Sequence, residues 1–584
     1  MRTDVLQLVR DAGPLTHVVI LTYNIDFQFV QHVLRPQLRK CGHPSLLIFA
    51  DARRSAESFA RGAAPAGLGV RYRVVPVAMP AGASFHPKAV LMSGSTRGTL
   101  LVGSGNLSFG GWRENGEIWL RRATDRHGTA TFAYFQAYLR RIVARVPLSD
   151  VLVADIDAAF EGATRTWAQD MEDPGGLVGR VGDGPSLLDQ MRDVMRTRTF
   201  SELAIASPYF DKKAHAVTAL RAAFGHVDTQ LLVPRTGNNL RAAAAAALPP
   251  QVTLSSTTFT HAAESDNPRE GFVHAKFYAL TSDSRVDLFL GSANASRAAL
   301  LSSGGHGNAE LLAHVEMSAA EYRNQLLAEL AITATPPLFA APPDDDADDD
   351  DEQETCLQIL AARLNGGALL VGFRATDGVR VTACVLDGVE AEDFTVRAQV
   401  LEVQAPASPR TVYLLGTLAG ETVTSPLCWI DQEEQLQTSS AARALADELR
   451  NSPGGATPDL GAWTNILTLF CQHLEALPPA SAAHATTHQP PTGAGATFTK
   501  DDVFVDEARL HFGPITTTNA PGGHGRATLL QQLMLRWFHG TRDAPAGEDG
   551  DDGSTPAKHA GRTHHHRRHT PTPNAPDVAA SIAS

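Results

Sequence analysis

The sequence predicts an α/β protein built from two related repeats, followed by a small β domain. Three observations support this prediction. Strand-like and helix-like segments alternate in two successive passes, the same short motifs occur in both passes, and an acidic segment preceded by prolines then ends the pattern. We therefore expect two pseudo-symmetric mixed-sheet α/β/α repeats that form one unit, then a small β-sandwich-like domain, a helical segment and a disordered tail.

The two repeats are expected over residues 1–172 and 186–335, joined by a glycine- and proline-containing bridge at 173–185. In the first repeat the strand-like segments are 17–23, 46–51, 72–79, 88–92, 99–103 and 117–120, and the helix-like segments are 27–39 and 131–146. In the second repeat the strand-like segments are 203–207, 230–233, 272–280, 286–290 and 311–315, and the helix-like segments are 187–198, 212–224 and 318–330.

The remainder of the chain changes character at residue 336. Residues 336–353 contain a dense acidic run and are expected to be a linker. Short alternating stretches at 368–373, 379–386, 394–403 and 411–418 predict a small β domain over 354–434. Residues 438–478 show helical periodicity, and 479–584 are expected to be mostly disordered, with a short helix near 527–538.

Charge and cysteine content exclude several classes of protein. The chain has 584 residues with 50 Lys+Arg and 63 Asp+Glu, a net charge of −13, so it is not a polycation that coats nucleic acid. Residues 1–340 carry +4 and the rest −17, so only the front could accept a phosphate-bearing substrate. Five dispersed cysteines without a C-x-x-C predict neither a disulfide framework nor a zinc site. With no apolar run of membrane-spanning length, we expect a soluble cytoplasmic protein without membrane insertion.

One constellation of motifs occurs twice. His86-Pro87-Lys88 and His274-Ala275-Lys276 each contain one of only seven lysines, although chance predicts roughly 0.26 His-x-Lys triplets in this composition. Each triplet is followed by Gly-Ser-x-Asn, with the asparagine 18 residues after the lysine, and then by Asn-x-Glu. The corresponding residues are Ser104, Asn106, Asn115 and Glu117 in the first copy, and Ser292, Asn294, Asn308 and Glu310 in the second.

The residue types suit phosphoryl chemistry. A His-x-Lys on a strand places both side chains on one face, and a neighbouring strand that ends in Gly-Ser-x-Asn can bring an amide beside them. Lysine contributes a positive charge and asparagine a neutral donor, which together suit the non-bridging oxygens of a phosphoryl group. Histidine can act as nucleophile or as proton shuttle near neutral pH. Two facing copies would therefore offer a nucleophile and an acid.

With these motifs the sequence resembles the phospholipase D superfamily, whose signature is a duplicated His-x-Lys followed by Gly-Ser-x-Asn. Ser93 and Thr281 stand where the commonest version has an Asp five residues after the lysine. That departure and the long Lys-to-Asn interval are similar to the tyrosyl-DNA phosphodiesterase branch, as are residues 22–26 and 112–120. The resemblance covers about residues 15–320.

The resemblance implies a role for each motif residue. His86 would attack phosphorus to form a phosphohistidine, and His274 would protonate the leaving oxygen and then activate water. The groups that would hold the phosphoryl oxygens are Lys88, Lys276, Asn106 and Asn294, with Ser104 and Ser292 as further substrate contacts. Glu117 and Glu310 would bind the far nitrogens of the imidazoles, unless they are ordinary strand or capping residues. Neither a metal nor another cofactor is required, because the lysines supply the positive charge.

The predicted function is a metal-independent phosphodiesterase whose substrate is nucleic acid, most simply DNA, as in a nuclease or an end-processing enzyme of bacterial defence or repair. Two alternatives remain. One is a phospholipase or phosphatidyl-transfer enzyme, and the other is a non-catalytic binding module with a protein partner on the β domain and tail.

Several other residues are open to two interpretations. Four residues that follow corresponding strands could be packing and N-cap residues or substrate contacts, namely Tyr23, Asp26, Tyr209 and Asp211. The pairs Arg53-Arg54 and Arg121-Arg122 could bind a phosphate backbone or simply be solvated. The histidine cluster at 564–569 reads as a solvated basic end rather than a metal site.

Overall fold

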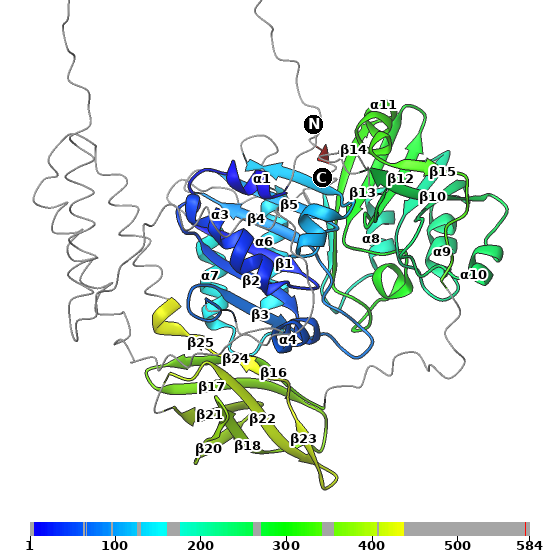
Figure 1. Ribbon diagram of the computed structural model, residues 1–584. Coiled ribbons are helices and arrows are strands. Elements are labelled where there is room, and N and C mark those ends of the chain that lie inside the picture. Colours follow the sequence, from blue (N-terminus) through cyan, green and yellow to red (C-terminus); the bar gives the residue numbers. More distant parts are fainter. Residues whose placement is uncertain are drawn as a thin grey trace, which may run out of the picture. The chain divides into compact units, whose positions relative to one another are not determined.

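The computed structural model describes residues 5–61, 65, 67–94, 97–124, 130–160, 176–260, 270–340, 356–405, 408–436 and 578–579 (Figure 1). The chain divides into two compact units, Met1–Arg443 with Thr570–Ser584, and Ala444–His569. Every described residue belongs to the first unit. The helical segment expected at 438–478, the short helix near 527–538 and all of the expected tail except 578–579 lie outside the described residues.

The first repeat contains a mixed sheet with the strand order β26-β6-β5-β4-β1-β2-β3. The strands β1, β2 and β3 are parallel, whereas β4, β5 and β6 add to β1 in antiparallel fashion. The strands are β1 (His17–Thr22), β2 (Ser45–Asp51), β3 (Arg73–Val77), β4 (Ala89–Ser93), β5 (Gly98–Gly103), β6 (Trp119–Ala123) and β26 (Val578–Ala579). The helices are α1 (Val5–Arg10), α2 (Phe27–Phe29), η1 (Val30–Leu34), α3 (Arg35–Lys40), α4 (Ala52–Ala60), η2 (Gly110–Glu114), α6 (Ala130–Val143) and α7 (Asp150–Phe160).

The second repeat has the same arrangement, with the order β11-β10-β9-β8-β12-β13-β14-β7 and β15 paired to β10. Here β8, β9 and β10 are parallel, and β12, β13 and β14 are antiparallel additions. The strands are β7 (Leu177–Arg180), β8 (Glu202–Ala206), β9 (Asp228–Pro234), β10 (Val252–Thr260), β11 (Glu270–Gly271), β12 (Phe277–Ser282), β13 (Arg285–Gly291), β14 (Glu310–Ser318) and β15 (Ala331–Thr333). The helices are α8 (Leu187–Val194), α9 (His215–Ala223), α10 (Ala242–Ala246), η3 (Arg297–Leu301), α11 (Ala319–Glu321), η4 (Tyr322–Leu326) and η5 (Leu327–Glu329).

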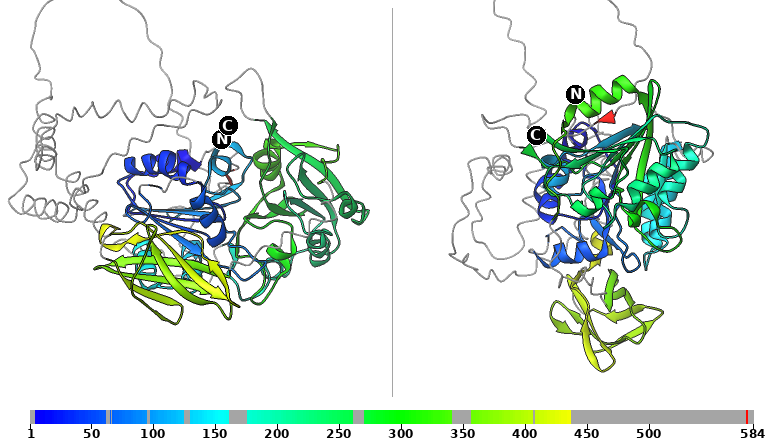
Figure 2. Two further views of the ribbon diagram at one scale, coloured as in Figure 1. Left: turned by 60° about the horizontal axis from the view of Figure 1, so that its bottom comes forward. Right: turned by 90° about the vertical axis from the view of Figure 1, so that its right-hand side faces the viewer.

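The two repeats share one hydrophobic core. Alternate residues of β1 and β2 point to opposite faces of the first sheet, as strand geometry requires. One face packs with α6, α7 and one face of the second sheet in a single cluster, and the other face packs with α1, η1 and α3. Helices α8 and α9 cover the remaining face of the second sheet. Figures 1 and 2 show helices on both faces of the first sheet. The predicted pair of pseudo-symmetric α/β/α repeats is confirmed.

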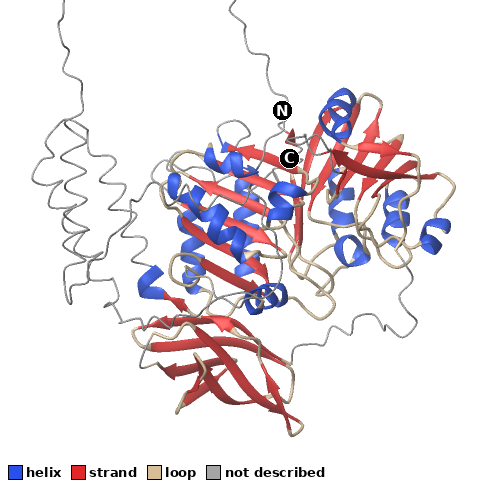
Figure 3. Ribbon diagram, in the orientation of Figure 1, coloured by secondary structure: helices blue, strands red, loops and turns tan. Residues whose placement is uncertain are grey.

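The β domain is a sandwich of two sheets, drawn almost entirely as strands in Figure 3. One sheet has the order β20-β21-β17-β16-β25, and the other has β19-β18-β22-β23 with β24 paired to β22. The strands are β16 (Leu357–Asn365), β17 (Ala368–Ala375), β18 (Arg380–Leu386), β19 (Val389–Glu390), β20 (Phe394–Arg397), β21 (Val400–Gln404), β22 (Thr411–Leu418), β23 (Glu421–Thr424), β24 (Cys428–Trp429) and β25 (Asp431–Gln432).

The β domain and the first repeat share buried contacts. The Trp429 ring lies edge-on to Phe27 and Phe59, with centroids 6.1 and 5.3 Å away, and the same hydrophobic cluster contains residues of β1 and β16. Arg73 of β3 is buried and its guanidinium binds Asp431 at 3.2 Å and Glu433 at 2.9 Å. A shared core and buried ion pairs of this kind make the sandwich part of the same compact unit rather than an appendage on a tether.

Three local predictions are wrong. The bridge at 173–185 contains β7, which pairs with β14 as an edge strand. The single strand predicted at 394–403 is a hairpin, because Ala398 and Gln399 adopt positive φ and reverse the chain without a glycine. Residues 336–340 of the expected linker pack on the second repeat, where Leu338 N–H donates to the Arg235 carbonyl and Ala340 N–H to the Leu240 carbonyl. Residues 341–355 lie outside the described residues.

Candidate active site

The two His-x-Lys triplets lie in extended segments just before β4 and β12. The prediction that each triplet lies on a strand is therefore wrong. Each segment is held by the other repeat. Phe85 forms a parallel bridge with Ala309, and His86 N–H donates to the Ala309 carbonyl at 3.0 Å. Gly116 forms the corresponding bridge with Val273, and its carbonyl accepts from His274 N–H at 2.8 Å. The backbone therefore places each histidine beside the Asn-x-Glu motif of the opposite copy.

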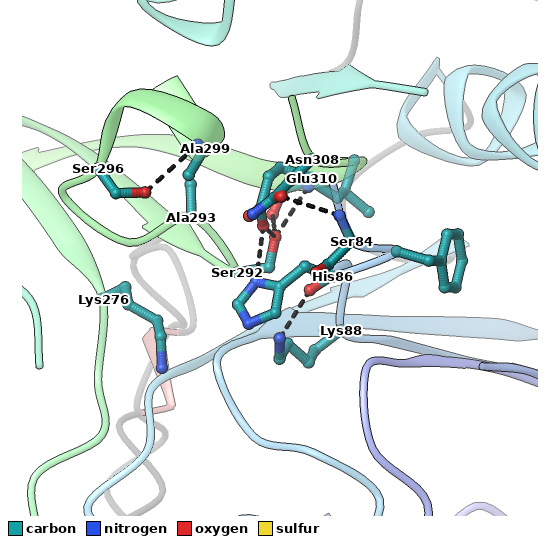
Figure 4. Close-up of polar contacts among 12 residues, drawn as sticks. Ser84, His86, Lys88, Lys276, Ser292, Ala293, Ser296, Ala299, Asn308 and Glu310 are labelled. Atoms are coloured by element: carbon teal, nitrogen blue, oxygen red, sulfur yellow. Dashed lines mark hydrogen bonds and ion pairs between the residues drawn. The ribbon is translucent and has the colours of Figure 1, made fainter. Parts of the chain in front are cut away.

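The histidine–glutamate pairs consequently cross between the repeats. The Nδ1 of His86 lies 3.0 Å from Glu310 Oε2, and the Nδ1 of His274 lies 2.8 Å from Glu117 Oε1. Figure 4 shows the first of these pairs, with Lys276 entering from the second repeat. A carboxylate on Nδ1 selects the tautomer that carries its proton there. The Nε2 atom of each ring is left with a lone pair.

The pKa values of both imidazoles are lowered. Burial is the main cause for His86, reinforced by Lys88 and Lys276, and it outweighs the carboxylate of Glu310, so the pKa falls to about 4. Burial and the two lysines also lower the pKa of His274 against the opposing effect of Glu117. Both imidazoles are therefore neutral at neutral pH. Each ring is influenced by the lysine of the other copy, which places the two halves around one centre.

The two lysines are fully buried but make different contacts. Each ammonium donates to the carbonyl of its own histidine at 2.7 Å. Lys276 Nζ also lies 2.8 Å from His274 Nε2. Burial lowers the pKa of Lys276 to about 7 and that of Lys88 well below its usual value, despite the nearby glutamates. A bound anion would stabilise the charged ammonium forms, so the site is electrostatically suited to a phosphoryl group.

The two motif serines, predicted to contact the substrate, bind the glutamates in this structure. Ser104 and Ser292 are completely buried, and their hydroxyls donate to Glu117 Oε2 and Glu310 Oε2. Each hydroxyl also accepts the backbone N–H that follows its glutamate, at 3.0 and 2.9 Å. The serines therefore hold the glutamates in place. Their short polar side chains are equally compatible with either role, so the sequence could not separate the two.

Two asparagines without an assigned role complete the support of the glutamates. Asn308 Nδ2 donates to Glu310 Oε1 at 3.0 Å, while its Oδ1 accepts the N–H of Ser84, two residues before His86. Asn115 Nδ2 lies 3.4 Å from Glu117 Oε1. The signal was present in the sequence, because both belong to the repeated Asn-x-Glu. Burial raises the pKa of both glutamates, but the partner histidine, a nearby lysine and the serine hydroxyl lower it, and the net shift is downward.

The motif asparagines Asn106 and Asn294 have the same environment in both copies. In the described part of the chain, the Oδ1 atom of each is buried without a hydrogen-bond partner. Such an atom costs about 1–3 kcal/mol when it stays unpaired. In the first copy a Cβ on Gly105 would come within 2.1 Å of the Gly111 carbonyl, so glycine lets η2 pack closely behind Asn106. Both Oδ1 atoms can therefore still accept a hydrogen bond from a ligand.

An aromatic ring flanks each histidine. The Tyr23 ring lies 5.0 Å from His86 and edge-on to it, and its hydroxyl accepts from Arg54 Nε at 2.7 Å. The Tyr209 ring lies 6.1 Å from His274 and is 37% exposed. Phe272 packs against the same histidine at 5.7 Å.

The remaining candidates have structural contacts. Asp26 caps α2, as the N-cap interpretation predicts. The N-cap of α9 is Ala214, but the Asp211 carboxylate still accepts the N–H groups of His215 and Ala216. Arg122 reaches the His314 carbonyl at 3.5 Å, and Arg121 is half-buried on β6.

The histidine cluster at 564–569 lies outside the described residues. Within the described ranges, no group of three or more His, Cys, Asp or Glu side chains is arranged to hold a metal ion. None of the described helices is long and apolar enough to cross a membrane.

No protein-family model and no curated protein matches the chain. Among solved structures, it is similar to polyphosphate kinase from Porphyromonas gingivalis, at 12% identity over 56% of this chain and 47% of that chain, with a TM-score of 0.30. It therefore spans less than half the length of that kinase. It is also similar to yeast tyrosyl-DNA phosphodiesterase, at 10% identity over 53% and 86% with a TM-score of 0.33. NucT from Helicobacter pylori matches at 18% identity over 26% and 96%, with a TM-score of 0.18.

Proposed function

We propose that this chain is a phosphodiesterase of the phospholipase D type that cleaves nucleic acid through a phosphohistidine on His86. The observation that supports it best is the pair of crossed histidine–glutamate contacts, which leaves two neutral Nε2 atoms beside two buried lysines. A nucleophile and a proton carrier around one anion-binding centre are what a two-step displacement at phosphorus needs.

In the first step, the Nε2 lone pair of His86 attacks phosphorus, and the bond from phosphorus to the leaving oxygen breaks. The leaving oxygen takes a proton from His274 Nε2. Lys276 lies 2.8 Å from that nitrogen and can supply the proton beforehand. His86 keeps its Nδ1 proton and donates it in a hydrogen bond to Glu310. The negative charge of Glu310 stabilises the positive charge that develops on the ring.

In the second step, water attacks phosphorus from the side that the leaving group vacated. His274 Nε2 accepts the water proton, with Glu117 stabilising the resulting imidazolium. The bond between phosphorus and His86 breaks and restores the free enzyme. Lys88, Asn106 and Asn294 bind the non-bridging oxygens through both steps, and Lys276 joins them once His274 has returned its proton, so positive charge comes from side chains rather than from a metal.

A nucleic-acid substrate is favoured over a lipid by the charge distribution. Residues 1–340 carry a net +4, while the other end of the chain is acidic. Arg53 and Arg54 lie in the first turn of α4, and Arg54 contacts the tyrosine beside His86. Guanidinium groups close to the reacting phosphate suit a substrate with several phosphates in a row.

The decisive experiment is hydrolysis of an end-labelled single-stranded oligonucleotide in EDTA. We expect cleavage by the full chain, none by His86→Ala, and normal cleavage by Lys213→Ala, which alters an exposed lysine outside the site. Complete loss in EDTA that a divalent ion restores would overturn the mechanism. Cleavage of phosphatidylcholine vesicles without cleavage of the oligonucleotide would replace the substrate class with lipid.

A further inference from the structure

A small cavity lies next to the catalytic segment and is formed by two parts of the fold. Its volume is about 80 Å³, and its walls include Asp51 and Arg53 at the start of α4, Ser84, and Gln358 and Arg374 of the β domain. A single water needs only ~10–15 Å³ of such volume, so the cavity has room for a larger polar group.

The wall of this cavity is directly coupled to the reaction centre. Ser84 lies two residues before His86, and its N–H donates to Asn308, which in turn binds Glu310. The next residue, Phe85, donates its N–H to Asp51 Oδ2 at 2.9 Å. Asp51 is also close enough to Lys88 to influence its pKa. The cavity therefore adjoins the site on the side of His86.

The charges of the cavity favour an anion. Arg53 is half-buried and forms a 3.9 Å ion pair with Glu57. Arg374 on β17 donates from Nη1 to the Met79 carbonyl at 2.9 Å, and is likewise half-buried. Both oxygens of the opposing carboxylate, Asp51, already accept backbone hydrogen bonds. Oδ1 caps α4, and Oδ2 accepts from Phe85 N–H. Burial raises the pKa of Asp51.

We infer that this cavity binds the phosphate that flanks the scissile phosphate on the His86 side of a nucleic-acid strand, with Arg374 and Arg53 as its ligands. Arginine forms paired hydrogen bonds with phosphate oxygens, and proteins that bind single strands follow the backbone with a positively charged groove. The β domain is then part of the substrate site. This inference rests on the proposed function, since it assigns a second phosphate of the same substrate.

The test compares Arg374→Gln with Arg397→Gln, which alters an exposed arginine on β20 of the same domain. Both full-length variants are assayed on a single-stranded oligonucleotide at several salt concentrations and on bis(p-nitrophenyl) phosphate, which has one phosphate. We expect Arg374→Gln to lower kcat/KM for the oligonucleotide about tenfold relative to the small ester. The salt dependence of oligonucleotide binding should fall by about one phosphate contact. Arg374→Lys should restore the salt dependence, and Arg397→Gln should match the wild type.

Two results would overturn the subsite alone, given a wild-type protein that cleaves the oligonucleotide. One is an equal loss on both substrates by Arg374→Gln, which would mean that Arg374 only supports the loop at Met79. The other is no loss on either substrate. A wild-type protein that hydrolyses the small ester but not the oligonucleotide would overturn the nucleic-acid substrate as well.

Discussion

The two copies of the motif carry the same residue types but have different surroundings. Tyr23 beside His86 is bonded to Arg54, whereas Tyr209 and Phe272 provide a more apolar setting beside His274. Lys276 contacts the ring of its own histidine at Nε2, and Lys88 reaches only the carbonyl of His86 among its described hydrogen bonds. Duplication therefore supplies the geometry of a double site. In the proposed mechanism, the neighbours of each copy decide which histidine attacks and which one carries protons.

Replacing each histidine by alanine in turn tests this division most severely. His86→Ala should abolish turnover and leave no phosphoryl adduct, because the attacking nitrogen is gone. His274→Ala should slow turnover by about 10²–10⁴-fold and accumulate the adduct with good leaving groups, which need little protonation. The measurement is labelled-adduct formation on an alkaline denaturing gel. An adduct on the His86→Ala protein would mean that the two copies share or exchange their roles.

The crossed pairs provide the second test. With a good leaving group, which needs little protonation, Glu310→Gln should slow adduct formation and Glu117→Gln should slow its breakdown, each by about 10–100-fold, since each glutamate orients the histidine of the other copy. Rapid-quench kinetics separate the two steps. If Glu117→Gln instead affects only adduct formation, each glutamate acts on its own copy in solution and the crossed arrangement is wrong.

The pH profile tests the role of Lys276. With a pKa of about 7, Lys276 loses its charge in the free enzyme as pH rises, so kcat/KM should fall about tenfold per pH unit above that value. On the acid side, kcat/KM should fall below about pH 4, where His86 becomes protonated. Lys276→Arg should remove the alkaline decline even at reduced activity, because guanidinium keeps its charge. A decline that stays near pH 7 in this variant would assign it to another group.

The smallest expected effect is on stability. The pKa of Lys276 is lower in the folded chain than in the unfolded chain, so its burial destabilises the fold at and below pH 7, and this cost disappears as pH rises toward 10.5. Lys276→Met should therefore raise the Tm at pH 7 by ~5 °C while removing activity. Thermal unfolding of both proteins at pH 7 and pH 10 checks the sign of this change in Tm. A lower Tm at pH 7 would show that its contacts with His274 outweigh the cost of burial.

Much of the site could be predicted from sequence because its residues recur at equal spacing. The 18-residue interval from Lys88 to Asn106 and from Lys276 to Asn294 identified both copies. The partner of each histidine could not be predicted, because it depends on the pairing of Phe85 with Ala309, which are far apart in the chain. The role of Ser104 could not be predicted either, since only the fold shows that its hydroxyl is buried against Glu117.

The fold shows the same limit. The central strands of both sheets are apolar and were predicted, whereas the short edge strand β7 lies in a glycine-rich segment without strand periodicity. The hairpin between β20 and β21 turns at Ala398 and Gln399, which carry no turn signal. The contact of the β domain with the first repeat depends on Arg73 meeting Asp431 and Glu433, and a single sequence does not reveal such a long-range pair.

The exchange of glutamates between the repeats also bears on how such a molecule could arise. One repeat alone would present a histidine without its carboxylate and a carboxylate without its histidine, because His86 pairs with Glu310 and His274 pairs with Glu117. A single-repeat ancestor could complete its chemistry only as a twofold-symmetric pair of identical chains. Two such repeats joined in one chain make that partnership permanent. In a joined chain, a residue such as Arg54 can stand on one side of the site without being repeated on the other.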